Sequence, residues 1–266
     1  MPLATVVVFV LLMVSLQTPL VFPAHAVGPA GPLPRGATHL TVETSDGDTL
    51  HGIHIPAASA ARTPRTLVLG FGGNAWNGAD VATQLHSSFP HAEVVVFHYR
   101  GYAPSTGTPS ATALLADAPL VHDVAVERVK PDRTIAVGFS IGSAVTASLA
   151  ARRPLDGLIL VTPFDSLKAA ASDLYPWLPV ATFFEHELNT AAYLKDARVP
   201  VAMISGDRDT LIRPARTQAL RQQVTNLVYD RIIAGAGHND IYQRPEYEQA
   251  MVEALDVLGR SGAPAR

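Results

Sequence analysis

A serine set between two glycines is the clearest chemical feature of this 266-residue chain. Residues 134–144 read TIAVGFSIGSA, so Ser140 follows a short apolar run typical of a buried strand and precedes a segment typical of a helix. Gly138 and Gly142 leave room for a sharp turn that exposes the serine hydroxyl. The pattern predicts a nucleophilic serine, with the Ile141 N–H facing the negative charge that its reaction creates.

A serine nucleophile needs a base, and the base needs an orienting carboxylate. The stretch PVAMISGDRDTLIRP supplies a strand, a glycine and then two candidates, Asp207 and Asp209. The stretch DRIIAGAGHNDIY supplies a last strand and a glycine-rich loop with His238, which is the only one of ten histidines to combine a late position, a loop and flanking glycine. We expect His238 to be the base. Asp209 is the preferred carboxylate because it lies deeper in its loop, while Asp207 is expected to cap or solvate the turn.

A second backbone donor for an oxyanion hole is expected from LVLGFGGNAWN. The glycines at 70, 72 and 73 let the backbone turn sharply and leave the Asn74 N–H available. These glycines do not match G-x-G-x-x-G, so a dinucleotide site is not predicted. Tyr99 and Arg100 are expected to brace the active-site loop rather than to touch substrate.

The elements that must position these residues follow an alternating pattern. From Thr38 onward, an opening hairpin is predicted around residues 45–48, followed by near-continuous apolar runs that are typical of strands covered on both faces. Helix-like segments lie between the runs, at Asp80–Ser88, Ser110–Val129, Ile141–Arg152, Pro214–Gln223 and Pro245–Leu258. The alternation predicts an α/β fold with a mostly parallel, doubly wound sheet.

One interval, Phe164–Tyr193, is too long for a simple crossover and is predicted to be a short helical lid insertion. It contains the apolar stretch LYPWLPVATFF, which includes Trp177 and Phe183. Two interpretations stay open for this stretch: core packing, or an acyl-binding wall in which Trp177 and Phe183 contact substrate.

The N-terminal segment resembles a secretory signal. Residues 1–26 carry no Lys, Arg, Asp or Glu, and the apolar run ends in Ala-His-Ala. We expect export, secreted or periplasmic, with residues 1–26 removed and outside the fold. An uncleaved membrane anchor formed by residues 3–22 is the alternative, and it would associate the protein with a membrane. Residues 27–37, rich in Pro and Gly, are predicted to be a linker before an α/β domain at 38–266.

Composition excludes several classes of function. A formal net charge of −3 provides no basic excess for phosphates, so no nucleic-acid partner is expected. The chain has no cysteine, which excludes disulfides, thiolate metal sites and cysteine nucleophiles. His51 and His54 would face opposite sides of a strand, so no metal site is predicted there. The oligomeric state is not indicated by the sequence.

Six stretches carry a family resemblance: GFGGNAWN, FHYRGYAPSTG, GFSIGSA, TPFDSL, SGDRDTLIRP and GHND. In this order they resemble serine α/β-hydrolases of the lysophospholipase-like and serine-aminopeptidase-like group, over about Thr38 to Leu258. The resemblance implies the α/β-hydrolase fold, with Ser140 as nucleophile, Asp209 as acid and His238 as base. It also implies oxyanion N–H donors at Asn74 and Ile141, and no metal or organic cofactor.

The expected function is that of a serine hydrolase acting on a small-molecule carboxylic ester or thioester through an acyl-enzyme on Ser140. The resemblance also covers serine exopeptidases, for which Glu185 and Glu187 could bind a free amino terminus. A non-catalytic binding protein with the same fold is the alternative from another class.

Overall fold

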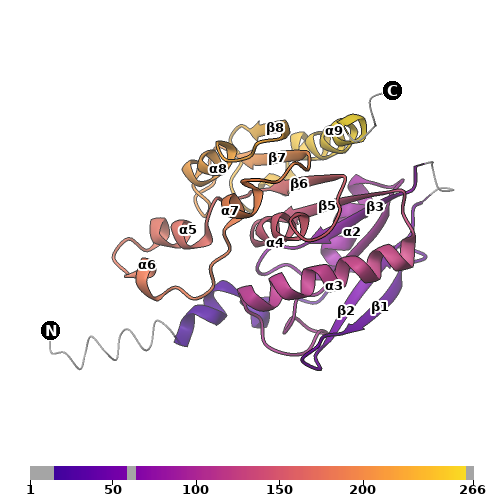
Figure 1. The fold of residues 1–266 in the computed structure, drawn as a ribbon, viewed down its shortest axis with the longest axis horizontal. Helices are drawn as coiled ribbons and strands as arrows, with labels where there is room; N and C mark the ends of the chain where they lie inside the picture. The colour runs from indigo at the N-terminus through magenta and orange to yellow at the C-terminus, as the bar shows by residue number, and fades with distance from the viewer. Residues whose placement is uncertain (1–14, 59–63, 262–266) are drawn as a thin grey trace.

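An eight-stranded sheet forms the centre of the computed structural model, which describes residues 15–58 and 64–261 (Figure 1). The strands are β1 (Thr38–Glu43), β2 (Thr49–Ile55), β3 (Thr66–Phe71), β4 (Glu93–Phe97), β5 (Arg133–Phe139), β6 (Gly157–Val161), β7 (Val201–Gly206) and β8 (Leu227–Ile233). Their spatial order is β1-β2-β4-β3-β5-β6-β7-β8. Only β1 and β2 pair antiparallel with their neighbours, and all pairs from β4 to β8 are parallel. The mostly parallel sheet predicted from the apolar runs is confirmed.

Helices cover both faces of this sheet. They are α2 (Gly78–Ser88), α3 (Ala111–Val129), α4 (Ile141–Ala150), α5 (Leu167–Leu174), α6 (Val180–Phe183), α7 (Thr190–Leu194), α8 (Pro214–Arg221) and α9 (Pro245–Ser261), with short 3-10 turns η1 (Ala24–Ala26) and η2 (Ile241–Gln243). Helices α2 and α9 pack into one apolar core, while α3 and α4 pack into the other. The five helices expected from the sequence are present, with ends shifted by three residues or fewer.

Strand β3 shows why the strand sequences are apolar without alternation. Leu67 and Leu69 point into the core beneath α3 and α4, whereas Val68 points into the core beneath α2 and α9. All three side chains are fully buried. Since both faces of the strand are covered, apolar residues are favoured at every position.

Local sequence signals set the starts of several helices. Asn77 and Ser110 precede α2 and α3, and their side chains accept hydrogen bonds from the Ala79 and Ala113 N–H groups at 3.0 Å each. Such caps satisfy donors that have no partner within the helix. Pro214 opens α8, where its missing N–H and fixed φ suit the first turn.

The predicted insertion Phe164–Tyr193 contains α5, α6 and the start of α7. Helices α5 and α6 stand beyond the end of the sheet, whereas α7 lies against α4 (Figure 1). Leu188 and Thr190 are completely buried, so the last part of this interval belongs to the domain core.

The segment before Thr38 lies partly within the fold, which differs from the sequence expectation. Residues 15–21 form a helix, and Phe22 is 1% exposed in the core shared with α3 and α4. Burial of this large ring in the apolar core is favourable, which explains why the segment packs on the domain. The segment expected to be a linker is also hydrogen-bonded to the start of α2. The Asn77 side chain donates to the Gly28 carbonyl, and Asp80 accepts from the Gly31 N–H. Residues 1–14 lie outside the described residues.

Candidate active site

Ser140 lies on a tight turn between β5 and α4. Its backbone has φ 51° and ψ −115°, a conformation that costs a non-glycine residue on the order of 1–3 kcal/mol. The flanking glycines are required by close contacts, since a Cβ on Gly138 would meet Thr146 and one on Gly142 would overlap the Phe71 carbonyl. The surrounding structure therefore holds the serine on a sharp turn between strand and helix, as the sequence predicts, with the residue in the lining of a cavity.

His238 and Asp209 complete a line of hydrogen bonds with Ser140. The Nε2 atom of His238 is 3.1 Å from the Ser140 Oγ, and its Nδ1 atom is 2.7 Å from Asp209 Oδ2. A carboxylate on Nδ1 requires that nitrogen to carry the proton, which leaves Nε2 free to accept from the serine hydroxyl. The three predicted residues, which come from three different loops, are thus brought together.

The Asp209 carboxylate is itself fixed by the backbone. Its Oδ1 atom accepts from the Leu211 N–H at 2.9 Å and from the Ile212 N–H at 2.8 Å. The residue is 5% exposed. Both oxygens therefore have partners, and the carboxylate holds the His238 ring in one orientation.

Asp207, the rival carboxylate, makes a different contact. Its Oδ1 atom accepts from the Gly235 N–H at 2.6 Å and ties the loop after β7 to the loop after β8. The side chain is exposed and is hydrogen-bonded to this turn rather than to His238. This placement matches the turn-stabilising position expected from the sequence.

The glycine-rich loop after β3 runs past the serine. A Cβ placed on Gly73 would lie 3.8 Å from the Ser140 Cβ, and both Asn74 and Ile141 line the same cavity as Ser140. The backbone groups expected to bind an oxyanion thus lie beside the nucleophile. Their role as donors remains a prediction.

Two tyrosines from the loop after β4 support this oxyanion loop. The Tyr99 hydroxyl donates to the Gly72 carbonyl at 2.8 Å, and the Tyr102 hydroxyl donates to the Asn74 carbonyl at 2.5 Å. Burial raises the pKa of both phenols, so they remain protonated donors. Tyr99 was expected to brace the site. Tyr102 was missed, although it lies in the same sequence stretch.

Arg100 anchors the loop that carries these tyrosines. Its guanidinium binds Asp117 of α3 through two hydrogen bonds of 3.1 and 2.6 Å, and Asp46 of the β1–β2 turn at 2.7 Å. The planar guanidinium suits this paired recognition of carboxylates. Arg100 thus acts on the site through the loop, as the sequence suggested.

A cavity of about 410 Å³ opens beside the nucleophile. Among the described residues, those that line it carry no charged side chain, and the polar ones are Gln17, Asn74 and Ser140, together with the amphipathic Tyr175 and Trp177. The other lining residues include Ile141, Leu167, Leu174, Trp177, Val180, Phe183, Leu211 and Ile212. Trp177 and Phe183 are thus placed at this cavity, although 70% and 42% of their surfaces are exposed.

Three lining residues come from the N-terminal segment: Gln17, Leu20 and Val21. They were missed because the apolar run from 1 to 22 is also the pattern of a removable leader. Elsewhere, His54, which was considered as a metal ligand, pairs with Glu93 at 2.8 Å. Within the described residues, no group of three or more His, Asp or Glu side chains is arranged to hold a metal ion.

The comparisons with known proteins agree with the observed fold. A family model for the alpha/beta hydrolase fold matches residues 67–192. An uncharacterized protein of Mycobacterium tuberculosis, Rv2307c, is 32% identical over 240 residues, which are 87% of this chain and 83% of its own. The chain belongs to the alpha/beta hydrolase family, and this membership supports hydrolase activity.

Two further similarities describe the range of related proteins. Lysophosphatidylserine lipase ABHD12 of Danio rerio is 26% identical over 221 residues, which are 71% of this chain and 58% of the lipase. The solved structure of Pyrococcus furiosus esterase Pf2001 aligns with a TM-score of 0.71 at 17% identity, over 89% of this chain and 96% of the esterase. At this identity the structural similarity concerns the fold.

Proposed function

We propose that this protein is a serine hydrolase that cleaves carboxylic esters or thioesters of acyl-chain substrates through an acyl-enzyme on Ser140. The observation that carries the proposal is the Ser140–His238–Asp209 hydrogen-bonded line beside a cavity whose described lining residues are uncharged and mainly apolar. An apolar cavity with a few convergent polar groups, including a serine hydrogen-bonded to a histidine, is the usual sign of an active site.

The geometry supports acyl transfer in two steps. His238 Nε2 takes the proton from Ser140 as Oγ attacks the substrate carbonyl, and the same proton is then given to the departing alcohol or thiol. The acyl group remains bonded to Oγ. Water then attacks this ester with His238 again as the base, and the returned proton restores the Ser140 hydroxyl as the acid leaves.

The Asn74 and Ile141 N–H groups would bind the oxyanion of each tetrahedral intermediate. Donors that are already in place stabilise the developing charge without reorganisation, and losing one typically costs about 3 kcal/mol of transition-state stabilisation. The tyrosine bonds to the Gly72 and Asn74 carbonyls keep that loop in position. The Ile141 N–H is in the first turn of α4, where the helix dipole adds to the effect.

The cavity supports an acyl substrate of medium length. Its volume falls within the range of about 300–1,000 Å³ that is usual for small-molecule sites. Each buried methylene contributes about 0.8 kcal/mol to binding, so longer chains gain affinity until the cavity is filled. The similarity to an esterase and to a lysophosphatidylserine lipase is in line with this substrate class.

The exopeptidase alternative lacks a supporting contact. Glu187 accepts from the Ser166 hydroxyl at 3.0 Å, and neither Glu185 nor Glu187 is among the residues that line the cavity. An amino terminus bound near Ser140 would need a carboxylate partner in this desolvated space. We therefore keep ester or thioester cleavage as the proposed reaction.

A panel of substrates tests the proposal. Purified protein is assayed on 4-nitrophenyl esters from acetyl to palmitoyl and on aminoacyl 4-nitroanilides, with Ser140→Ala as the matched control. We expect kcat/KM to peak at medium acyl length and to vanish in the control. Faster cleavage of aminoacyl amides than of any ester would replace the proposal with the exopeptidase, and inactivity on the whole panel would refute it.

A further inference from the structure

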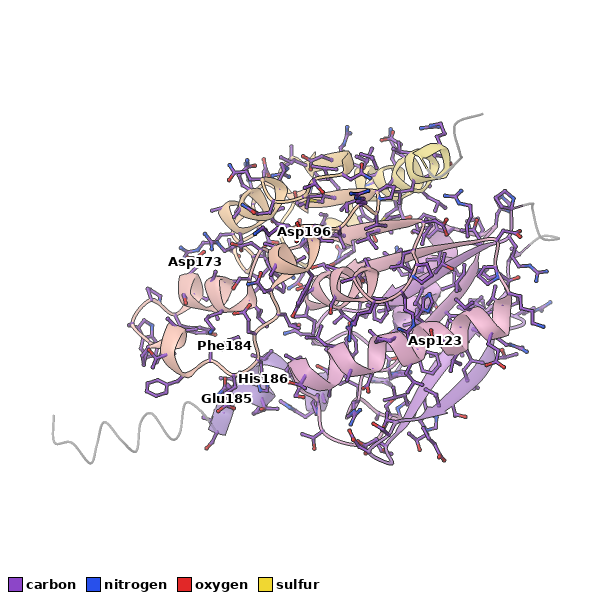
Figure 2. The ribbon with its side chains drawn as sticks, in the orientation of Figure 1. Asp123, Asp173, Phe184, Glu185, His186 and Asp196 are labelled. Carbon is purple, nitrogen blue, oxygen red and sulfur yellow. The ribbon has the colours of Figure 1, made fainter. Side chains whose placement is uncertain are left out.

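The N-terminal helix at residues 15–21 is tied to the lid insertion at several points. Gln17 bridges the lid backbone, because its Nε2 donates to the Phe183 carbonyl at 3.3 Å and its Oε1 accepts from the Glu185 N–H at 2.8 Å. The next residue of the helix makes a further contact with the lid, because the Thr18 hydroxyl lies 2.7 Å from His186 Nε2. Figure 2 shows Glu185 and His186 beside this helix, which is drawn in indigo in Figure 1.

Phe22 fixes the end of the same helix in the core. Its ring meets the His186 ring edge to face, with centroids 5.1 Å apart. His186 is 6% exposed, and burial lowers its pKa, so the neutral ring is favoured at this contact. The segment is thus held by backbone, side-chain and aromatic contacts together.

The helix also faces the substrate cavity. Leu20 and Val21, with Gln17, line the same space as Ser140 and the lid residue Phe183. The lid covers the cavity on one side, and the N-terminal helix contributes to another part of its wall. Removal of residues 1–26 would delete these lining side chains together with the buried Phe22.

We propose that the N-terminal segment is retained in the working enzyme, where residues 17–21 form one wall of the acyl-binding cavity and limit acyl-chain length. This inference rests on the proposed ester hydrolase function. It assigns substrate selectivity to a segment whose composition alone resembles a leader. It also favours retention of residues 1–26 over removal after Ala26, with residues 17–22 packed on the domain rather than within a membrane span.

A pair of matched variants tests the inference in the full-length chain. Val21→Trp adds bulk to the cavity wall, whereas Leu16→Trp introduces the same side chain at a 40%-exposed position outside the cavity lining. The readout is the ratio of octanoyl to acetyl ester kcat/KM. We expect Val21→Trp to lower this ratio by about tenfold or more, in line with pocket discrimination by methylene groups, and Leu16→Trp to leave it at the wild-type value.

The outcomes separate the two proposals. Wild-type protein that hydrolyses no ester overturns the proposed function and this inference with it. An active wild type whose ratio is unaffected by Val21→Trp overturns the inference alone.

The native N-terminus provides a second measurement that does not depend on a variant's folding. Sequencing of the protein purified from its natural source should find a terminus ahead of Gln17. A mature protein that begins at Val27 would overturn the inference even if both variants failed to fold.

Discussion

Replacing Asp209 with Asn separates the two candidate carboxylates and tests the orientation of His238. The Asp209 side chain accepts two backbone N–H bonds on Oδ1 and faces His238 Nδ1 with Oδ2. An asparagine carbonyl can keep the two backbone bonds. Its amide then presents N–H donors to Nδ1, which must become an acceptor.

The substitution should change the tautomer of His238 and thereby lower kcat. With Nδ1 accepting, the ring proton moves to Nε2, which then points an N–H at Ser140 and cannot take the serine proton. The same change in a well-studied serine protease lowers kcat by about 10⁴, equivalent to roughly 5.5 kcal/mol of barrier. We expect a loss of that order here, with little change in stability because the backbone bonds persist.

Asp207→Asn is the matched control. Its side chain accepts a single bond from the Gly235 N–H, which an asparagine carbonyl can retain. We expect kcat/KM on a medium-chain ester within a few-fold of wild type, and a similar melting temperature. Both variants and wild type are assayed at the same pH after their folding is checked by circular dichroism. The reasoning is refuted if Asp207→Asn is the more damaging change, or if Asp209→Asn keeps a tenth or more of the wild-type kcat.

The remaining predictions concern the cavity, acid stability and membranes. Phe183→Ala should flatten the acyl-length profile more than Trp177→Ala, because Trp177 is 70% exposed; equal effects in kcat/KM measurements would contradict this. Burial, followed by the nearby His51, lowers the pKa of His98 to about 4, below the usual 6.5, so its stabilising contribution is complete above pH 6.5 and is lost as the pH falls toward 4. The free energy of unfolding, measured in urea, should fall by about 3 kcal/mol over this range, and the fall should be smaller in His98→Gln. An unchanged pH dependence in that variant would be evidence against the assignment to His98. Membrane association through the N-terminal segment also stays a prediction: the full chain should float with phosphatidylcholine vesicles and Leu20→Asp should float less, whereas a chain that remains unbound would disprove it.

Much of the fold could be predicted because its signals are local. Continuous apolar strands, capped helices and the glycine-flanked Ser140 each follow from short stretches of sequence. The order of Ser140, Asp209 and His238 could also be read directly, since each follows a strand that ends at the same edge of a parallel sheet. These features depend on secondary-structure periodicity and topology, which the sequence carries plainly.

The features that were missed depend on contacts between distant segments. Tyr102 reaches the Asn74 carbonyl from another loop, and Gln17 binds lid backbone atoms more than 160 residues away. No local pattern indicates such partners. The N-terminal run misled the interpretation, because an uncharged apolar segment is typical of a removable leader, which we expected, or of an anchor, which was the alternative. No helix in the described part of the chain has the length and apolar character needed to cross a membrane.

Covalent labelling of the nucleophile tests the central claim most directly. A fluorophosphonate probe is applied to wild type, Ser140→Ala and Ser143→Ala, and the modified peptide is identified by mass spectrometry. Ser143 is fully buried and its hydroxyl donates to the Ser140 carbonyl at 2.5 Å, so it is a neighbouring serine without access to the probe. The account predicts one adduct, on Ser140, that is absent from Ser140→Ala and present in Ser143→Ala. Labelling that persists in Ser140→Ala, or a wild type that takes up no probe, would contradict it.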